Sequence, residues 1–175
     1  MITYSDYSEG GAGALVNYMR TDQGREISIR DHTGKALSRD ELEQFVQHSK
    51  ECGFERQFIV SPDPDLDVHH RAFDRRTRAL MRQWRADKAN VRYVYAVHDQ
   101  RDKPHAHVAV TGPKRELYMD RDDLDTFRET ATDVFRESER TSHRQRTTDA
   151  QRTLTASQST VCEYDRTATR DTHHE

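Results

Sequence analysis

The sequence predicts an α+β fold, in which an antiparallel β-sheet carries helices on one face. Segments that alternate polar and apolar residues, as half-buried strands do, are interleaved with segments that have the apolar spacing of amphipathic helices. Two of the strand-like segments, residues 92–98 and 105–111, are separated by only a short loop, which is typical of an antiparallel hairpin. Elements mixed in this way pack as an antiparallel sheet covered by helices.

Two further strands are predicted before this hairpin. Ile27 and Ile29 alternate with polar residues and indicate a strand over Glu26–Arg30. A short apolar run indicates another strand over Gln57–Ser61, and Pro62 ends it because proline has no backbone N–H to donate. These segments would complete the sheet.

The first predicted helix follows Ser38. Ser38 and Glu41 have the spacing of a capping box, in which each residue satisfies a backbone N–H group at the start of a helix. Gly53 is suited to end this helix, because glycine adopts the left-handed conformation of a C-terminal cap at little cost. The apolar side chains at helical spacing are Leu42, Phe45 and Val46.

Two more helices are predicted downstream, over His69–Ala86 and from Asp120 or Asp122 onward. The apolar face of the first contains Phe73, Thr77, Leu80, Met81 and Trp84. Its opposite face carries arginines at alternating spacings of four and three residues, namely Arg71, Arg75, Arg78, Arg82 and Arg85. The apolar side chains of the later helix are Leu124, Phe127, Ala131, Val134 and Phe135.

Composition bounds the domain organisation. Charged residues make up 34% of the 175 residues and hydrophobic residues 33%, so polar surface exceeds that of an average globular chain. Much of the excess lies in residues 139–175, which have too few apolar side chains to form a core. The sequence therefore predicts a folded domain over residues 1–138 and a disordered tail over residues 139–175.

Several classes of protein are disfavoured. No apolar run is long enough to span a bilayer, and the N-terminus lacks the pattern of a secretory signal. Cys52 and Cys162 are too few for a disulfide scaffold, so we expect a cytoplasmic protein that is not inserted in a membrane. The net charge of −3 shows that the chain as a whole is not a basic nucleic-acid binder.

Three histidines in the hairpin form the most informative pattern. His105 and His107 share one face of their strand, while Val108 points to the other face. His98 ends the preceding strand, and the hairpin can bring it beside the other two. Three neutral imidazoles can hold a metal ion and leave room for water or a substrate oxygen. We therefore expect a metal site on the sheet face away from the helices, although histidines at this spacing also occur on exposed faces without a ligand.

Three segments together resemble the HUH endonuclease superfamily, and within it the VirD-type relaxases, which are plasmid mobilisation (MOB) nucleases. Residues 98–108 resemble their three-histidine motif, with Pro104 before the His-hydrophobic-His pair. Residues 14–20, which include Tyr18, resemble the N-terminal tyrosine motif, and residues 55–62 resemble the strand that ends in Ser-Pro. The segments occur in the order found in the family and cover about residues 14–112. The resemblance implies a palm-like antiparallel sheet.

The resemblance also implies a chemistry, the nicking and rejoining of single-stranded DNA during plasmid mobilisation and conjugative transfer. Tyr18 would attack the scissile phosphate and form a 5′-phosphotyrosine intermediate, which keeps the bond energy for rejoining. His98, His105 and His107 would hold Mg²⁺ or Mn²⁺, and ligand chemistry alone equally allows Zn²⁺. The expected partners are single-stranded DNA at a transfer origin and accessory mobilisation proteins.

Other residues have less specific roles in this interpretation. Tyr4 and Tyr7 are alternative nucleophiles. Asp99 and Asp102 lie close enough in the sequence to orient the imidazole rings, and Asp99 is a candidate general base. The candidates for contacts with DNA are Arg20, Ser61, Arg101 and Lys103. The arginines of the helix over His69–Ala86 are expected to point away from the histidines, to solvent or to a second nucleic-acid or partner contact.

Two alternative functions remain open. A rolling-circle replication initiator or a single-tyrosine transposase of the same superfamily uses similar chemistry. Those proteins typically have two histidines and another ligand, so that His98 favours a relaxase. Because the chain is short for a relaxase, the alternative of a different class is a non-catalytic module, derived from a relaxase, that binds DNA or a metal ion.

Overall fold

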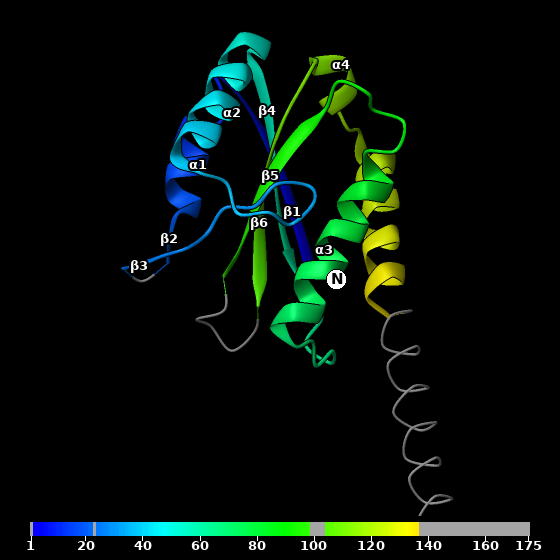
Figure 1. Cartoon of the computed structure of the whole chain (residues 1–175). Coiled ribbons are helices and arrows are strands. Elements are labelled where there is room, and N and C mark those ends of the chain that lie inside the picture. The colour runs from blue at the N-terminus through cyan, green and yellow to red at the C-terminus, as the bar shows by residue number, and fades with distance from the viewer. Residues whose placement is uncertain (1, 23, 99–103, 137–175) are drawn as a thin grey trace, which may run out of the picture. The chain divides into compact units, whose positions relative to one another are not determined.

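A computed structural model of the chain describes residues 2–22, 24–98 and 104–136. It contains a four-stranded antiparallel sheet with the order β1-β4-β6-β5 (Figure 1). The strands of this sheet are β1 (Ile2–Glu9), β4 (Phe54–Ser61), β5 (Arg92–His98) and β6 (His105–Thr111). A second, small sheet pairs β2 (Thr21–Asp22) with β3 (Arg25–Glu26).

Helices cover both faces of the large sheet (Figure 1). On one face lie α1 (Gly13–Met19) and α2 (Arg39–Cys52), which share a hydrophobic cluster with Val94, Ala96 and Ala109. On the other face lie α3 (His70–Trp84), the short α4 (Lys114–Leu117) and a helix over residues 121–136. The α+β class and the antiparallel sheet are thus confirmed, but the helices are not confined to one face. Strands β5 and β6 explain this difference, because both are buried on both sides and each side needs a cover.

The hairpin has the predicted bounds. Its register places His98 opposite His105 and Ala96 opposite His107. Tyr93 and Tyr95 point to the other face, where they belong to the larger hydrophobic cluster, as expected from the alternation along the strand. The predicted strand over residues 57–61 is also present, within a longer β4 that pairs with β1 on one side and β6 on the other.

The predicted strand over Glu26–Arg30 is wrong in its extent. Strand β3 contains only Arg25–Glu26, and Arg30 forms isolated bridges to Ala36 and Tyr95. Ile29 is nevertheless buried, in the smaller hydrophobic cluster. The alternation therefore indicates which side chains are buried. The backbone, however, pairs with the edge strand β5 only at Arg30 and forms no ladder with it.

The capping box predicted for α2 is present. Ser38 Oγ accepts a hydrogen bond from the backbone N–H of Glu41, and the Glu41 carboxylate accepts one from the backbone N–H of Ser38. Gly53 ends the helix with a φ of 67°, in the left-handed region. Hydrogen bonds from Lys35 and Ser38 lower the pKa of the Glu41 carboxyl to about 2. Local sequence rules thus determine both ends of this helix.

The two longer helices of the opposite face begin where they were predicted to begin. His69 caps α3 through a hydrogen bond that its ring accepts from the backbone N–H of Arg71. The helix over residues 121–136 begins after Asp120, whose carboxylate accepts a hydrogen bond from the backbone N–H of Asp123. Their inner faces pack on Phe58 at the centre of the larger cluster, which includes Phe73, Leu80, Met81, Phe127, Ala131 and Phe135.

The elements described above belong to one compact unit, Met1–Phe135, apart from the last residue of the final helix. The predicted tail over residues 139–175 lies outside the described residues, so that part of the domain prediction stays a prediction. Among the helices that are described, none is both long enough and apolar enough to cross a membrane.

Candidate functional site

Strands β5 and β6 bring His98, His105 and His107 together. One ring nitrogen from each histidine can be chosen so that the three atoms lie within 4.8 Å of one another. The ring centroids are 4.8 to 5.2 Å apart, with His98 and His107 buried and His105 half-buried. The cluster lies on the face that carries α1 and α2. The expectation that this face is free of helices is therefore wrong, and its reason is the two-sided burial of the sheet.

The C-terminal end of α1 contacts this histidine cluster. The Nε2 atom of His98 lies 3.1 Å from the backbone carbonyl oxygen of Met19. A carbonyl oxygen can only accept, so Nε2 donates the hydrogen bond and Nδ1 carries the lone pair when the ring is neutral. Contacts of this kind orient the imidazoles that bind metals. Sequence analysis missed the contact, because the partner is a backbone group that no side chain marks.

The donor set fits a divalent transition metal. Imidazole nitrogens bind Zn²⁺ at about 2.0–2.1 Å, so two nitrogens on one such ion lie at most about 4.2 Å apart. The three nitrogens lie within 4.8 Å of one another, so a single bound ion would require them to approach by up to about 0.6 Å. Imidazole also suits manganese less than zinc, while Mg²⁺ prefers oxygen ligands. The three nitrogens therefore favour Zn²⁺ over Mn²⁺ and Mg²⁺ as the ion that the cluster would hold.

Tyr18 lies beside the cluster. Its ring meets the ring of His107 edge-on, with the centroids 5.3 Å apart. Val16 and Met19 bury the inner face of α1, and Tyr18 of the same helix is 62% exposed. This tyrosine is thus largely exposed to solvent while its ring contacts a candidate metal ligand.

The alternative nucleophiles are placed differently or are not described. Tyr7 stacks on Phe54 with a centroid distance of 5.5 Å, and its neighbour across the ladder is Arg56. Phe54 belongs to the larger hydrophobic cluster, on the sheet face opposite to the histidines. The side chain of Tyr4 lies outside the described residues. Among the tyrosines that the structure describes, Tyr18 is the one in contact with the histidine cluster.

A hollow of about 300 Å³ adjoins Tyr18 between α1 and the strands β1 and β4. Glu55, in its wall, is only 8% exposed and accepts a hydrogen bond of 2.6 Å from the Ser8 hydroxyl. Gln57 and Asp6 also line the hollow, and they pair in the β1–β4 ladder. Sequence analysis missed this polar wall. The signal that could have revealed it was the pair of polar residues Glu55 and Gln57 at alternate positions of β4, which Phe54 and Phe58 flank.

The structure describes two of the residues that the sequence suggested for contacts with DNA, Ser61 and Arg20. Ser61 lies two residues beyond Ile59, which pairs with His107, so Ser61 is on the histidine face of β4. Arg20 caps α1 directly after Met19, is half-buried, and pairs with Glu26 at 3.5 Å. The other candidates, with the two aspartates expected to orient the rings, lie outside the described residues; they are Asp99, Arg101, Asp102 and Lys103.

Comparison with known proteins assigns no family to the chain. No protein-family model matches it, and no curated protein is significantly similar to it. Its function is therefore inferred from the histidine cluster, from Tyr18 and from the motifs in the sequence.

Proposed function

We propose that the protein nicks and rejoins single-stranded DNA by metal-dependent transesterification, with Tyr18 as the nucleophile. One observation carries the proposal. The Tyr18 ring lies 5.3 Å from the His107 ring, although the two residues belong to separate elements, α1 and β6. A nucleophile beside three imidazoles that can hold a divalent cation suits attack on a phosphodiester, because the cation would stabilise the negative charge that develops next to the nucleophile.

The chemistry conserves the number of phosphate ester bonds. Tyr18 Oη forms a bond to phosphorus as the bond from phosphorus to the 3′ oxygen of the upstream strand breaks. The tyrosine proton passes to water at this exposed side chain, and the leaving 3′ oxygen takes a proton from water to become a hydroxyl. The free 3′ hydroxyl can later attack the phosphotyrosine and return the proton to Oη. A divalent ion held by the three histidines would withdraw charge from the scissile phosphate.

The third histidine favours a relaxase over the related replication initiators and transposases. His98 belongs to the cluster by distance, at 4.8 Å from His107 between ring centroids, and it also contacts the end of the helix that carries Tyr18. The proposal includes the partners that such a reaction requires. These are single-stranded DNA at a transfer origin and accessory mobilisation proteins, encountered in the cytoplasm.

The test is the formation of a covalent adduct. The purified protein is incubated with Mn²⁺ and labelled single-stranded DNA from its own replicon, and the products are separated on a denaturing gel. We expect a labelled protein band that Tyr18→Phe reduces at least about 100-fold, the scale of losing a covalent nucleophile. Tyr118→Phe is the matched control, because Tyr118 is 59% exposed and lies in the α4 segment on the other face.

Three outcomes would change the proposal. An adduct that persists in Tyr18→Phe but disappears in Tyr4→Phe or Tyr7→Phe would move the nucleophile to that tyrosine. An adduct that forms equally well after His105→Ala and in the presence of a chelator would remove the metal from the reaction. A wild-type protein that binds Mn²⁺ and single-stranded DNA without forming any adduct would favour the non-catalytic module.

A further inference from the structure

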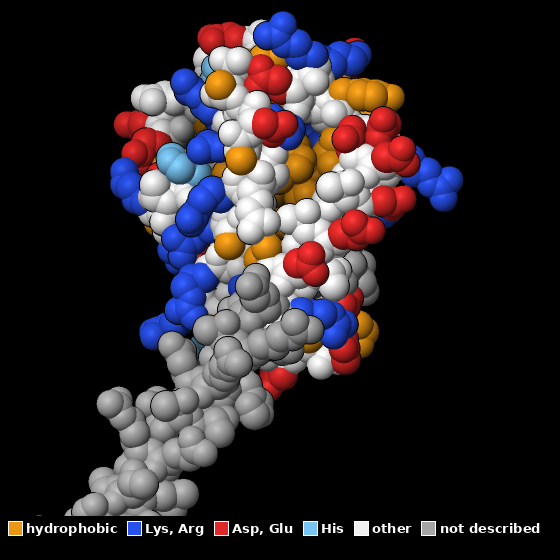
Figure 2. Space-filling model, turned by 90° about the vertical axis from the view of Figure 1, so that its right-hand side faces the viewer, with side chains coloured by type: hydrophobic (Ala, Val, Ile, Leu, Met, Phe, Trp, Pro, Cys, Tyr) orange, Lys and Arg blue, Asp and Glu red, His pale blue; other side chains and the backbone are white. Residues whose placement is uncertain are grey.

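The outward face of α3 carries a row of arginines on the side of the sheet opposite to the histidine cluster. We call this row the basic band, and its members are Arg71, Arg75, Arg78, Arg82 and Arg85. At 100° and 1.5 Å per residue, the five positions fall within an arc of about 80° and span about 21 Å. Figure 2 shows lysine and arginine side chains gathered along one side of this view of the molecule.

Two members of the basic band have structural partners. Arg78 donates hydrogen bonds to the Thr33 carbonyl at 2.7 Å and to the Asp74 carboxylate at 3.0 Å. Arg85 lies over the ring of Tyr93 at 5.8 Å. The remaining three are exposed, and their side chains form no hydrogen bond or ion pair with any described residue; they are Arg71, Arg75 and Arg82.

The charge around the basic band is unbalanced. Between Arg71 and Arg92 the chain has eight basic residues and two acidic ones, and Arg78 neutralises one of the two, Asp74. The neighbouring helix over residues 121–136 is acidic on its exposed face, with Asp122, Asp123, Asp125, Glu129 and Asp133. Figure 2 shows these two kinds of side chain on different parts of the same face. The positive field is therefore local, although the whole chain has a net charge of −3.

We propose that the basic band binds the phosphate backbone of double-stranded DNA. Its three unpaired arginines lie within about 40° of arc and about 16 Å of length, which matches about five base pairs at 3.4 Å each. Guanidinium groups bind phosphate oxygens through paired N–H groups, which gives strong but sequence-independent contacts.

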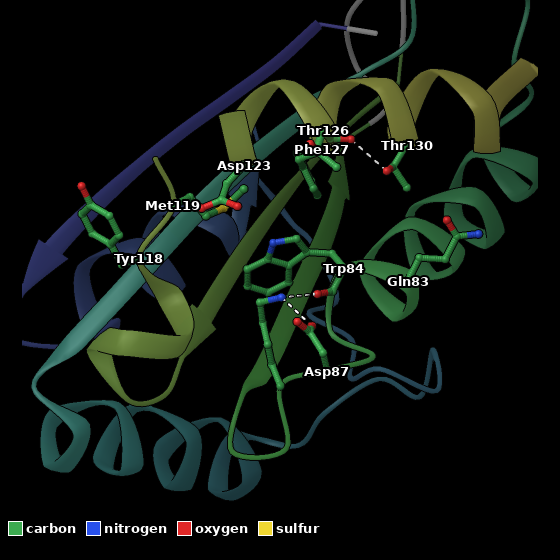
Figure 3. A pocket seen from close by; sticks show the side chains of 10 residues that line it. Gln83, Trp84, Asp87, Tyr118, Met119, Asp123, Thr126, Phe127 and Thr130 are labelled. Atoms are coloured by element: carbon green, nitrogen blue, oxygen red, sulfur yellow. Dashed lines mark hydrogen bonds and ion pairs between the residues drawn. The ribbon is translucent and has the colours of Figure 1, made fainter. Parts of the chain in front are cut away.

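The absence of aromatic rings from this surface favours a duplex over a single strand. Surfaces that bind single strands add exposed aromatic side chains on which the bases stack. Arginines and Gln83 are the exposed residues of α3. Its tryptophan, Trp84, faces away from the band and packs against Phe58 and Phe127, in a hollow at the helix over residues 121–136 (Figure 3).

The proposed duplex contact is separate from the proposed cleavage site. The sheet lies between α3 and the histidine cluster, so the two surfaces can be occupied together. The protein could then hold a double-stranded segment on one face while a single strand lies at Tyr18 on the other. Duplex binding is also measurable without cleavage, and one proposal can fail while the other stands.

The test compares how two triple variants bind a short labelled duplex of arbitrary sequence. Fluorescence anisotropy measures the affinity at a series of salt concentrations. Replacing Arg71, Arg75 and Arg82 with Gln should weaken binding at least about 10-fold near 0.1 M salt and lower the salt slope by about 2.7. The control replaces three exposed arginines outside the basic band with Gln, a change that lowers the net charge equally; these are Arg115 of α4 and Arg121 and Arg128 of the helix over residues 121–136. It should change the affinity less than about 3-fold, because screening limits the effect of distant charges.

Each further outcome has a defined meaning. Equal losses in both triple variants, or no duplex binding by the wild type, would overturn the proposal. The proposal would also be overturned if replacing Arg71, Arg75 and Arg82 weakened the binding of oligothymidine as much as the binding of the duplex. If the wild type instead self-associates at low salt and the variant of the basic band does not, the band contacts the acidic exposed face of the helix over residues 121–136 in a second copy. Tyr18→Phe should bind the duplex like the wild type, which separates this result from failure of the nuclease proposal.

Discussion

His98 has two contacts that link the sheet to α1. Its ring lies among the other two histidines, and its Nε2 donates to the carbonyl of Met19, next to Tyr18 in the chain. A single side chain therefore connects the candidate metal site to the end of the helix that carries the candidate nucleophile. This connection explains how a short helix without a capping side chain can hold Tyr18 in place.

The histidine cluster yields a prediction at the residue scale. His98→Ala and His107→Ala should each weaken Mn²⁺ or Zn²⁺ binding at least about 10-fold, because even the loss of a group that orients a ligand has effects of 10-fold to 100-fold. Isothermal titration calorimetry measures the affinities. His32→Ala, at an exposed position, serves as the control and should bind like the wild type. Unchanged metal affinity in both cluster variants would show that the ions bind elsewhere.

Buried polar groups near α3 show a second kind of residue-level constraint. The Tyr95 hydroxyl donates to Asp74 at 2.7 Å, and burial together with this hydrogen bond raises the pKa of the Tyr95 hydroxyl well above its ordinary value. The other oxygen of Asp74 accepts from Arg78, which also donates to the carbonyl of Thr33. These contacts connect β5, α3 and the turn at residues 31–34, so Arg78 serves the fold and is left unchanged in the test of DNA binding.

At the scale of the element, α2 depends on its capping box. Ser38→Ala should lower the free energy of unfolding by about 1 kcal/mol, the usual cost of losing such a cap. Arg39→Gln, which removes only an exposed ion pair with Glu43, should cost less than about 0.5 kcal/mol. Urea denaturation followed by circular dichroism measures both values. Equal effects of the two substitutions would mean that the cap does not contribute to stability.

The same capping box predicts a dependence on pH. The pKa of the Glu41 carboxyl is lowered from 4.5 to about 2 in the folded protein, so its contribution to stability is complete above pH 4.5. That contribution is lost as the pH falls from about 4.5 to about 2. In Glu41→Gln the urea midpoint of unfolding should therefore depend less on pH within this window than it does in the wild type. In Glu43→Gln the dependence should be the same as in the wild type. If the urea midpoint of Glu41→Gln fell with pH as steeply as that of the wild type, this linkage would be contradicted.

At the scale of the whole molecule, the sheet separates two hydrophobic clusters with different neighbours. The larger cluster lies under α3 and the helix over residues 121–136, whereas the smaller one lies under α1 and α2, beside the histidines. Stability is thus concentrated on the face opposite to the candidate cleavage site. The arrangement places the accessible Tyr18 and the basic band on separate surfaces of one scaffold.

Phe58 tests this distribution of stability. It is fully buried and contacts the rings of Trp84 and Phe127, at 5.1 and 4.6 Å between centroids. Phe58→Ala should lower the free energy of unfolding by about 3–5 kcal/mol, the range for deleting a core aromatic side chain. Chemical denaturation provides the measurement, and the exposed Tyr118→Ala should change it by no more than about 0.5 kcal/mol. A cost below about 1 kcal/mol for Phe58→Ala would contradict the packing described.

The sequence alone determined the elements that obey local rules. The capping residues of α2, the amphipathic pattern of α3 and the hairpin were all readable, because each depends on neighbours a few residues away in the chain. The convergence of the three histidines follows from the same rules, since alternation and a short loop suffice to bring them to one face. The orientation of the α3 arginines away from the histidines was also predictable from the pattern.

Tertiary structure decided what depends on contacts between distant segments. Helices cover both faces because β5 and β6 are buried on both sides, and the pattern within a strand does not show which distant helices pack on each face. The contact of Tyr18 with His107 and the hydrogen bond from His98 to Met19 depend on how α1 docks on the sheet. Seven residues without a capping side chain carry no local signal for that docking. Local rules thus predicted the cluster of three histidines, and long-range packing placed Tyr18 beside it.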